Sequence, residues 1–236
     1  MIQIKNIETF PTEIKSVILS RKNELIDELL KESEFLESEE KYWTSYETPI
    51  KNEVITNLKK ILINKSFSCF HCTKIINKSE IADNGLYPLN IKDLGKRILN
   101  NISNYLTDVQ INIFNNAFNN FQDGILGCRE NMIWFVSNYE ITRTTGCEYF
   151  YNYYGGEVTR RILYDYQNDF YPILKRIGMP ATVECCIETK ELFPNHFDNL
   201  IVQIIDSLLS ENQYINWEFY LSKHIPADKI IKIYEE

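Results

Sequence analysis

Apolar and polar positions follow two different periods along this chain, and the changes of period divide it into helices and strands. In the first 65 residues apolar side chains recur at about every third or fourth position, most clearly over residues 12–30 and 53–63. This spacing is typical of amphipathic helices, so we expect residues 1–65 to form a helical N-terminal region. The acidic run after the first helix is interpreted as a solvated helix face, with a cap over the site or a partner-binding arm as the alternatives.

Residues 67–75 read FSCFHCTKI, a short apolar run with one histidine at its centre, which is typical of a buried strand. Because side chains of a strand alternate between two faces, Cys69, His71 and Thr73 share one face and Cys72 lies on the other. His71 and Thr73 would therefore offer two polar groups to a ligand that lies across the strand. The alternative is a histidine at the edge of the core whose ring is hydrogen-bonded to a backbone carbonyl.

The middle of the chain carries clear signals for where helices begin and end. A short helix is expected to end at Gly85, because glycine is the residue type preferred just after a helix. Residues 91–121 keep the helical period and are divided at Thr107, a residue type that caps helix N-termini. A turn at 124–127 and an apolar, aromatic strand at 132–137 are expected to follow.

The C-terminal third alternates between helix and strand patterns. After a helix that ends near residue 175, we expect a strand beginning at Pro180, a helix at 200–209, a strand at 217–221 and a last strand reading IIKIY. Trp217 and Phe219 flank Glu218, so alternation places the carboxylate on the face opposite two large apolar side chains. The interspersed pattern favours an α+β protein built on a central mixed sheet with helical insertions.

Composition limits the classes of function. With 236 residues the chain is one large domain, or one domain with an appendage, and it can bury a sizeable core. The net charge of −8 argues against a broad, sequence-independent grip on nucleic acid, although a local basic groove remains compatible with it. No run has the length of a membrane span and no signal peptide pattern is present, so we expect a cytoplasmic protein without a membrane partner.

The cysteines are expected to be reduced thiols, because nothing in the sequence indicates secretion. The spacing Cys69-x-x-Cys72 is that of zinc ligands, but no second pair follows, so no metal is expected. A thiol enzyme built on one of these cysteines and His71 is a further alternative, although strand neighbours face opposite sides. The six cysteines of the chain are at positions 69, 72, 128, 147, 185 and 186.

The segment GCEYFYNYYGGEVTRRILYDY, residues 146–166, has the most unusual composition of the chain. Tyrosines cluster around Gly155 and Gly156, which precede a helix-compatible stretch. Paired glycines before a helix free backbone N–H groups and allow a ligand to approach closely. Aromatic packing around a tight contact is the alternative interpretation, and Glu157 could simply complement a helix N-terminus.

Two stretches at opposite ends of the chain carry a resemblance to a known family. One is the strand with His71 and Thr73, followed by a helix and Gly85-Leu86. The other is Glu218-Phe-Tyr-Leu, followed after two residues by His-Ile-Pro-Ala-Asp-Lys-Ile. Together they resemble ADP-ribosyltransferase-like folds, of the DarT type and related bacterial NAD-dependent ADP-ribosyltransferases. The resemblance implies that residues 66–236 form such a domain, with a split mixed or antiparallel sheet.

The resemblance also implies a function and a set of roles. It implies transfer of ADP-ribose from NAD to a nucleic acid or a protein, by a bacterial toxin or phage-defence effector with a possible antitoxin or immunity partner. Glu218 would be the catalytic carboxylate, with Glu157 and Glu184 as rivals, and Arg160 is one of four arginines (with Arg97, Arg143 and Arg161) that could complete the site. The residues expected to hold NAD are His71, Thr73, Gly85, Leu86, Tyr151, Tyr154, Gly155 and Gly156.

The chemistry suits these residue types. Breaking the nicotinamide–ribose bond builds oxocarbenium character at the sugar, which a nearby carboxylate stabilises. A neutral imidazole at His71 is expected to donate a hydrogen bond to the ribose. Two alternatives remain: an NAD glycohydrolase that uses water in the same pocket, and a non-catalytic module that binds a nucleotide or a protein.

Overall fold

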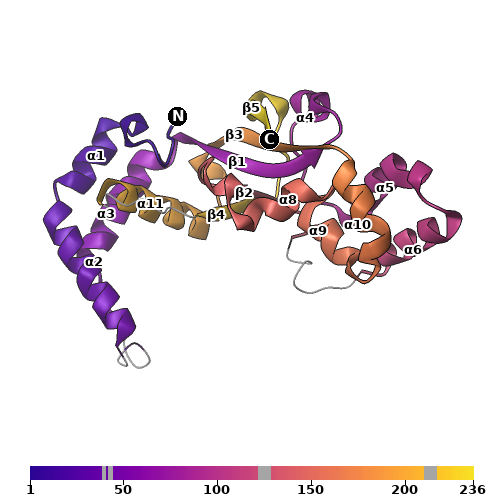
Figure 1. Cartoon of the computed structure of the whole chain (residues 1–236). Helices are drawn as coiled ribbons and strands as arrows, with labels where there is room; N and C mark the ends of the chain where they lie inside the picture. The colour runs from indigo at the N-terminus through magenta and orange to yellow at the C-terminus, as the bar shows by residue number, and fades with distance from the viewer. Residues whose placement is uncertain (39–40, 42–44, 122–128, 210–216) are drawn as a thin grey trace. The chain divides into compact units, whose positions relative to one another are not determined.

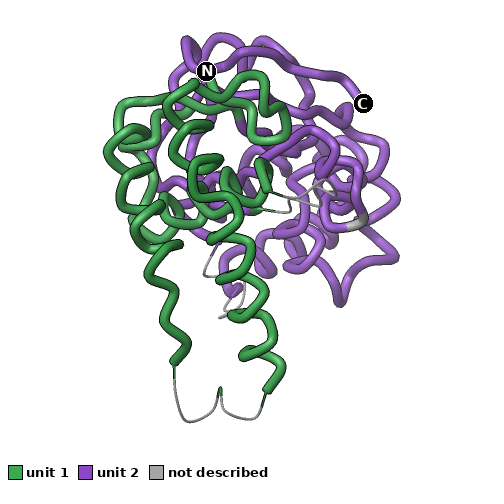
Figure 2. The backbone as a smooth tube through the Cα atoms, turned by 90° about the vertical axis from the view of Figure 1, so that its left-hand side faces the viewer, with its two compact units in different colours: residues 1–68, 187–217 green, residues 69–186, 218–236 purple. Residues whose placement is uncertain are grey.

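The computed structural model describes residues 1–38, 41, 45–121, 129–209 and 217–236 (Figure 1). The turn expected at 124–127 and Cys128 lie outside these residues. The chain forms two compact units, residues 1–68 with 187–217 and residues 69–186 with 218–236 (Figure 2). Within the described ranges, no helix has the length and apolar character needed to cross a membrane.

The first unit is helical. Its helices are α1 (Thr12–Leu19), α2 (Lys22–Glu37), α3 (Pro49–Leu62) and α11 (Pro194–Leu209). The single helix expected over residues 12–30 is wrong, because the structure has two helices there. At the break between the two helices, the Ser20 hydroxyl donates to the carbonyl of Val17 at 3.1 Å. This carbonyl therefore has a hydrogen-bond partner that is not the backbone amide of a continuing helical turn.

Residues 187–217 belong to this unit together with the N-terminal helices, whereas the division expected from the sequence ran only between residues 65 and 66. α11 packs against α1 and α3. The Ser207 hydroxyl of α11 donates to the carbonyl of Ile4 at 3.1 Å, and Lys59 of α3 pairs with Asp198 at 2.6 Å. The helical pattern of α11 was predicted, but its packing partners depend on contacts far apart in the sequence.

The structure contains a five-stranded sheet, so the α+β class is confirmed. Its strands are β1 (Ser66–Ile75), β2 (Ile133–Val136), β3 (Met179–Glu188), β4 (Glu218–Leu221) and β5 (Ile230–Glu235), in the order β4-β2-β1-β3-β5. Pairs β1–β2, β2–β4 and β3–β5 are antiparallel. All five strands lie where the apolar runs predicted them.

The register of the sheet fixes which side chains share a face. Val136 lies opposite Glu218 on one side and opposite Phe70 on the other. Phe135 lies opposite Phe219, and their rings stack with centroids 5.3 Å apart. Since directly opposite residues point to the same face, Glu218 shares a face with Phe70, and Phe135 and Phe219 share the other.

The second unit also carries helices around the sheet. They are α4 (Lys78–Asn84), α5 (Ile91–Ile102), α6 (Asp108–Asn119), α8 (Glu148–Asn152), α9 (Gly156–Ile162) and α10 (Gln167–Arg176). The expected ends at Gly85 and Thr107 are confirmed, the second by a capping box with Gln110. The helix expected to follow Gly156 and run to near residue 175 is instead two α-helices, with a short 3-10 helix over Tyr164–Tyr166 between them. The Tyr171 hydroxyl of α10 donates to the Arg160 carbonyl of α9 at 2.7 Å, which links the two helices.

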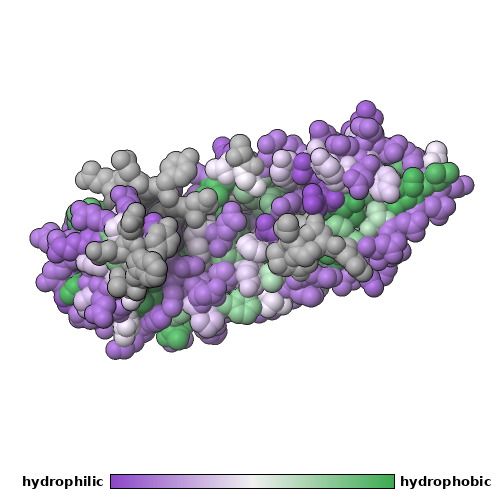
Figure 3. Space-filling model, turned by 90° about the horizontal axis from the view of Figure 1, so that it is seen from below, coloured by the Kyte–Doolittle hydropathy of each residue, from purple (hydrophilic) through white to green (hydrophobic). Residues whose placement is uncertain are grey.

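A second core joins the helices of this unit. Phe114 stacks on Phe118 with ring centroids 4.5 Å apart and meets Phe170 of α10 edge-on at 5.7 Å. This cluster includes residues of α5, α6, α9 and α10. The face of the protein seen in Figure 3 is largely hydrophilic, and smaller hydrophobic areas lie between the hydrophilic ones. Packing in this cluster therefore fixes α5, which contributes residues to the cavity described below.

Candidate functional site

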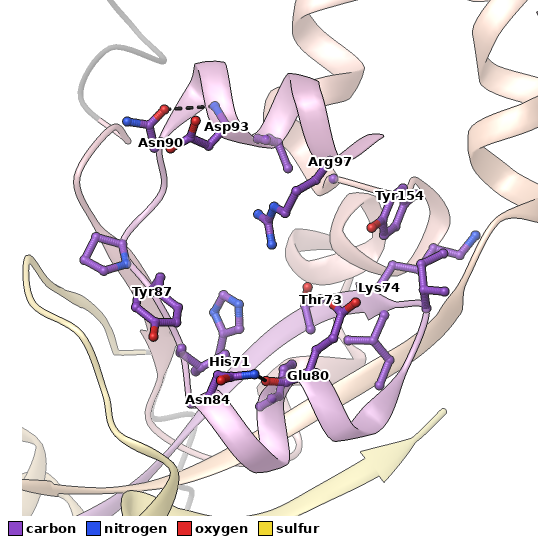
Figure 4. A pocket seen from close by; sticks show the side chains of 18 residues that line it. His71, Thr73, Lys74, Glu80, Asn84, Tyr87, Asn90, Asp93, Arg97 and Tyr154 are labelled. Atoms are coloured by element: carbon purple, nitrogen blue, oxygen red, sulfur yellow. Dashed lines mark hydrogen bonds between the residues drawn. The ribbon is translucent and has the colours of Figure 1, made fainter. Parts of the chain in front are cut away.

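A cavity of about 590 Å³ lies in the second unit, between β1, α4, α5 and the segment before α9. Figure 4 shows side chains from these elements converging on one space. Six of the eight residues expected to hold NAD line this cavity: His71, Thr73, Gly85, Leu86, Tyr154 and Gly155. The size is within the range of small-molecule sites, about 300–1,000 Å³.

His71 is held by β1 and by a hydrogen bond across to β2. Its Nδ1 lies 2.8 Å from the carbonyl oxygen of Trp134. A carbonyl only accepts, so Nδ1 carries the proton and Nε2 of the neutral ring is an acceptor. Burial lowers the pKa of His71 and so favours the neutral ring, whereas the hydrogen bond to Trp134 raises this pKa. In the neutral ring Nε2 can therefore accept a hydrogen bond from a ligand but cannot donate one, which differs from the expectation that neutral His71 donates.

The rim of the cavity joins the two stretches that carry the family resemblance. Leu86 and Ile225 exchange two backbone hydrogen bonds, each of 2.8 Å. Gly85 has φ +76, and a Cβ at this position would lie 1.9 Å from the Ile225 carbonyl oxygen. No side chain fits there without moving the backbone of the C-terminal segment. Glycine at this position therefore permits the close contact between the two segments.

Two aromatic rings stand beside this contact. The rings of Tyr87 and His224 are stacked with centroids 4.1 Å apart. His224 Nε2 donates to the backbone carbonyl of Asn84 at 2.7 Å, which fixes its ring at the end of α4. Tyr87 is exposed and lines the cavity, and His224 supports its ring from behind.

Opposite charges face each other across the cavity. Arg97 of α5 and Tyr154 lie on one side, and Glu80 of α4 lies on the other (Figure 4). Burial raises the pKa of Tyr154, the Arg97 cation opposes this rise, and the Glu80 carboxylate adds to it. The Tyr154 hydroxyl also accepts a hydrogen bond from Asn101 at 3.2 Å. An arginine and a carboxylate in one cavity suit a ligand with both phosphate and sugar hydroxyl groups.

Of the four arginines considered from the sequence, Arg97 lines this cavity. Arg143 pairs with Glu236 at 3.5 Å, and Arg160 lies over the ring of Tyr149 at 4.1 Å. Lys74 also lines the cavity, but its buried ammonium donates to the carbonyls of Leu174 and Lys175 at 3.2 and 2.5 Å. Among the described residues that line the cavity, Arg97 is thus the best placed cation for an anionic ligand.

Glu218 lines a smaller pocket of about 220 Å³ in the same unit. The residue is exposed, whereas Phe219 beside it is fully buried, as alternation predicted. Glu157 shares this pocket and forms an ion pair of 3.3 Å with Arg129. The guanidinium of Arg129 lies 4.2 Å from the centroid of the Trp134 ring. Glu157 also lies in the first turn of α9, where the alternative interpretation placed it as a carboxylate that complements a helix N-terminus.

The remaining sequence-predicted residues lie elsewhere. The Tyr151 hydroxyl is hydrogen-bonded to Thr182 Oγ1 at 2.6 Å and donates to Cys72 Sγ at 3.2 Å. Cys72 lies on the face of β1 opposite His71, so Tyr151 contacts that face. Gly156 begins α9 and packs against Phe150. Glu184 is buried and accepts from the Tyr234 hydroxyl at 2.8 Å. Within the described part of the chain, neither Tyr151 nor Gly156 lines the larger cavity.

His71 connects the two hollows. It lines both the cavity and the pocket that contains Glu218. β1 and β2 pair at one position in the described residues, Phe70 with Val136, and the ring of His71 reaches the Trp134 carbonyl just beyond it. His71 is thus the one described residue that lines both hollows, at the point where β1 and β2 pair.

Glu80, Tyr87 and His224 were not predicted from the sequence to belong to the site, and Arg97 was one of four candidate arginines. The only sequence feature that connected these residues with the site was that they lie close along the chain to Gly85 or to the stretch beginning at Glu218. Among the described residues, no group of three or more His, Cys, Asp or Glu side chains is arranged to hold a metal ion. Comparison of the chain with protein-family models, curated proteins and solved structures finds no match in any of the three.

Proposed function

We propose that this protein binds NAD and transfers its ADP-ribose to a macromolecular acceptor, a nucleic acid or a protein. One observation carries the proposal: His71 lines both the cavity that gathers six of the expected NAD residues and the pocket that contains Glu218. The proposal extends to an ADP-ribosyltransferase-like fold, in which the sheet would be split between β1 and β2.

The cavity would hold the ADP half of NAD. The planar guanidinium of Arg97 suits the pyrophosphate, because it presents several N–H donors in a fixed geometry. Tyr154 and Tyr87 offer aromatic surface for the adenine ring. The nicotinamide riboside would pass His71 into the smaller pocket, where Trp134 provides an aromatic wall. Thr73 and His71 Nε2 would then face ribose hydroxyl groups.

The reaction requires cleavage of the bond between the ribose C1′ and the nicotinamide nitrogen. Nicotinamide leaves with the bonding electron pair, and positive charge develops on the ribose ring. The carboxylate of Glu218 would stabilise this charge, and a nucleophile of the acceptor would then attack C1′. Phe219, buried next to Glu218, keeps the strand in place without using the carboxylate for folding.

One observation favours a second candidate function, a nucleotide-binding module without catalysis. The register places Glu218 on the face of Phe70, whereas Thr73 lies on the other face of β1. If the nicotinamide ribose stays on the side of Thr73, Glu218 is too far across the sheet to act. Glu80 and Asp93 would then be the carboxylates available to the ligand, since both line the larger cavity.

The test is incubation of the protein with NAD labelled in the adenylate phosphate, with and without cell extract. Label that becomes nuclease-sensitive indicates a nucleic-acid acceptor, and label that becomes protease-sensitive indicates a protein acceptor. Free ADP-ribose indicates glycohydrolysis. Binding of NAD without any labelled product, in extract or in water, would replace the transferase with the binding module.

A further inference from the structure

Two cysteines far apart in the sequence meet in the pocket that contains Glu218. Cys72 lies on β1 and Cys147 lies just before α8. Both line the pocket, and their exposed fractions are 7% and 5%. Both belong to one small buried cluster with Phe70 and Val136, which places the two thiols in the same wall of the pocket. The zinc-like spacing of Cys69 and Cys72 hid this pairing, because Cys72 faces away from Cys69.

The surroundings give the two thiols unequal acidity. The neighbouring Cys72 thiol lowers the pKa of Cys147, against the opposing effects of burial and of the Glu218 carboxylate. The neighbouring Cys147 thiol and burial raise the pKa of Cys72. Cys72 also receives a hydrogen bond from Tyr151 at 3.2 Å. Cys147 is therefore the thiol more readily present as a thiolate, which is the form that reacts with oxidants.

We propose that Cys72 and Cys147 are a site of reversible oxidation, at which a peroxide links them in a disulfide next to Glu218. The Cys147 thiolate attacks a peroxide oxygen, the O–O bond breaks, and a sulfenic acid forms on Cys147 while the departing hydroxide takes up the proton that the Cys147 thiol released and leaves as water. The sulfur of Cys72 then attacks the Cys147 sulfur, the S–O bond breaks, and a second water carries away the oxygen and the Cys72 proton. The protein loses two hydrogens and the peroxide is reduced to two waters.

The disulfide would change the pocket itself. A covalent S–S bond is about 2.05 Å long, shorter than a contact between two thiols, so the segment before α8 is drawn toward β1. The two sulfurs lie in the wall that Glu218 shares. Oxidation therefore narrows the pocket in which the proposed transfer takes place. The expected effect on transfer rests on the proposed function, whereas formation of the disulfide does not.

Another pair of thiols in the same unit provides a matched control. Cys69 and Cys185 are both fully buried, with the Cys69 sulfur 3.8 Å from the Cys185 backbone carbonyl. Burial raises the pKa of Cys185, and neither residue lines the larger cavity or the pocket in the described structure. These thiols share the sheet with Cys72 but lack a route for a small oxidant.

The experiment treats the purified full chain with hydrogen peroxide, blocks the remaining thiols with an alkylating reagent and maps peptides without reduction. We expect one linked pair, the Cys72 peptide with the Cys147 peptide, a mass loss of two hydrogens, and its disappearance after dithiothreitol. Cys147→Ser should abolish the link, and Cys185→Ser should retain it. Linkage through other cysteines of the wild-type protein would overturn the proposal. Alkylation of both Cys72 and Cys147 in the wild-type protein after peroxide treatment would overturn it as well.

Labelled-NAD turnover, measured in parallel, separates the two proposals. We expect peroxide to reduce turnover at least tenfold and dithiothreitol to restore it in the wild-type protein. A Cys72–Cys147 link in a protein that never turns over NAD would keep the disulfide and reject the transferase. Turnover without the link would keep the transferase and reject the disulfide.

Discussion

The two units of this protein differ in where several of their polar side chains point. In the first unit, buried side chains hold helices to their neighbours: Glu28 accepts from the backbone N–H groups of Ile50 and Lys51 at 3.1 and 2.7 Å, and Ser207 donates to Ile4. In the second unit, polar groups from several elements converge on a cavity instead (Figure 4). Polar groups that turn toward an open space contribute little to folding, so we attribute function to the second unit.

The same contrast exists within single residues. Glu28 and Glu218 are both carboxylates on regular elements, but Glu28 is buried against the start of α3, where the helix dipole also favours it. Glu218 is exposed on a strand whose neighbour Phe219 supplies the burial. Substitution of the first should therefore affect stability, and substitution of the second should affect activity.

The largest expected effect is that of Glu218→Gln. The amide keeps the size of the side chain but removes the charge that an oxocarbenium ion needs, so turnover of labelled NAD should fall about a hundredfold or more. The thermal midpoint and the NAD dissociation constant should stay close to those of the wild type. Glu80→Gln is the matched control within the larger cavity. A Glu80→Gln protein that loses turnover while Glu218→Gln keeps it would transfer the catalytic role to Glu80.

In the first unit we expect the reverse result for Glu28→Ala. Loss of the carboxylate leaves two backbone N–H groups of α3 without an acceptor, which should lower the free energy of unfolding by about 1–3 kcal/mol. Urea unfolding measures this change, and NAD affinity should be unaltered. Glu24→Ala, which removes an exposed ion pair with Arg21, should cost at most about 1 kcal/mol. Equal losses for the two variants would contradict the structural role of Glu28.

A smaller effect concerns pH. Burial lowers the pKa of His71 below its ordinary value of about 6.5. Below that value the unfolded chain binds a proton that folded His71 does not, so stability falls as the pH drops, until His71 itself is protonated. His71→Asn, which removes the titrating ring, should reduce this dependence in urea unfolding between about pH 7.5 and 5. His196 in the first unit, whose pKa burial also lowers, should keep its own share in that variant.

An unchanged pH dependence in His71→Asn would mean that His71 is accessible to protons in the folded protein. The comparison variant His196→Asn then shows whether the remaining dependence arises in the first unit. The two substitutions together divide the acid sensitivity between the units.

Local signals predicted much of the fold. Gly85 and Thr107 end and begin helices as expected, because a positive φ and a capping hydroxyl are properties of single residues and their near neighbours. The breaks at Ser20 and after Arg160 were missed, since each depends on one side-chain hydrogen bond to a carbonyl. Local patterns alone do not show which of two competing hydrogen bonds forms.

The site was predictable only in part, for a different reason. His71 and Thr73 share a strand, so alternation alone placed them on one face. Tyr151 was expected beside them, but which face of the sheet its hydroxyl meets depends on where α8 packs, and it meets Cys72 instead. Arg97 reaches the cavity because α5 lies across it, a long-range contact that no local spacing encodes.

The most direct test of NAD binding in the cavity is a calorimetric titration of NAD into the wild type, Arg97→Ala and Lys92→Ala. Both variants remove one positive charge from α5, but Lys92 is exposed and does not line the cavity in the described structure. Loss of charged hydrogen bonds worth about 1.5–3 kcal/mol should weaken NAD binding by about 10- to 100-fold in Arg97→Ala. Lys92→Ala should bind as the wild type does. Absence of binding heat in the wild type, or equal affinity in all three proteins, would contradict the assignment of this cavity to NAD.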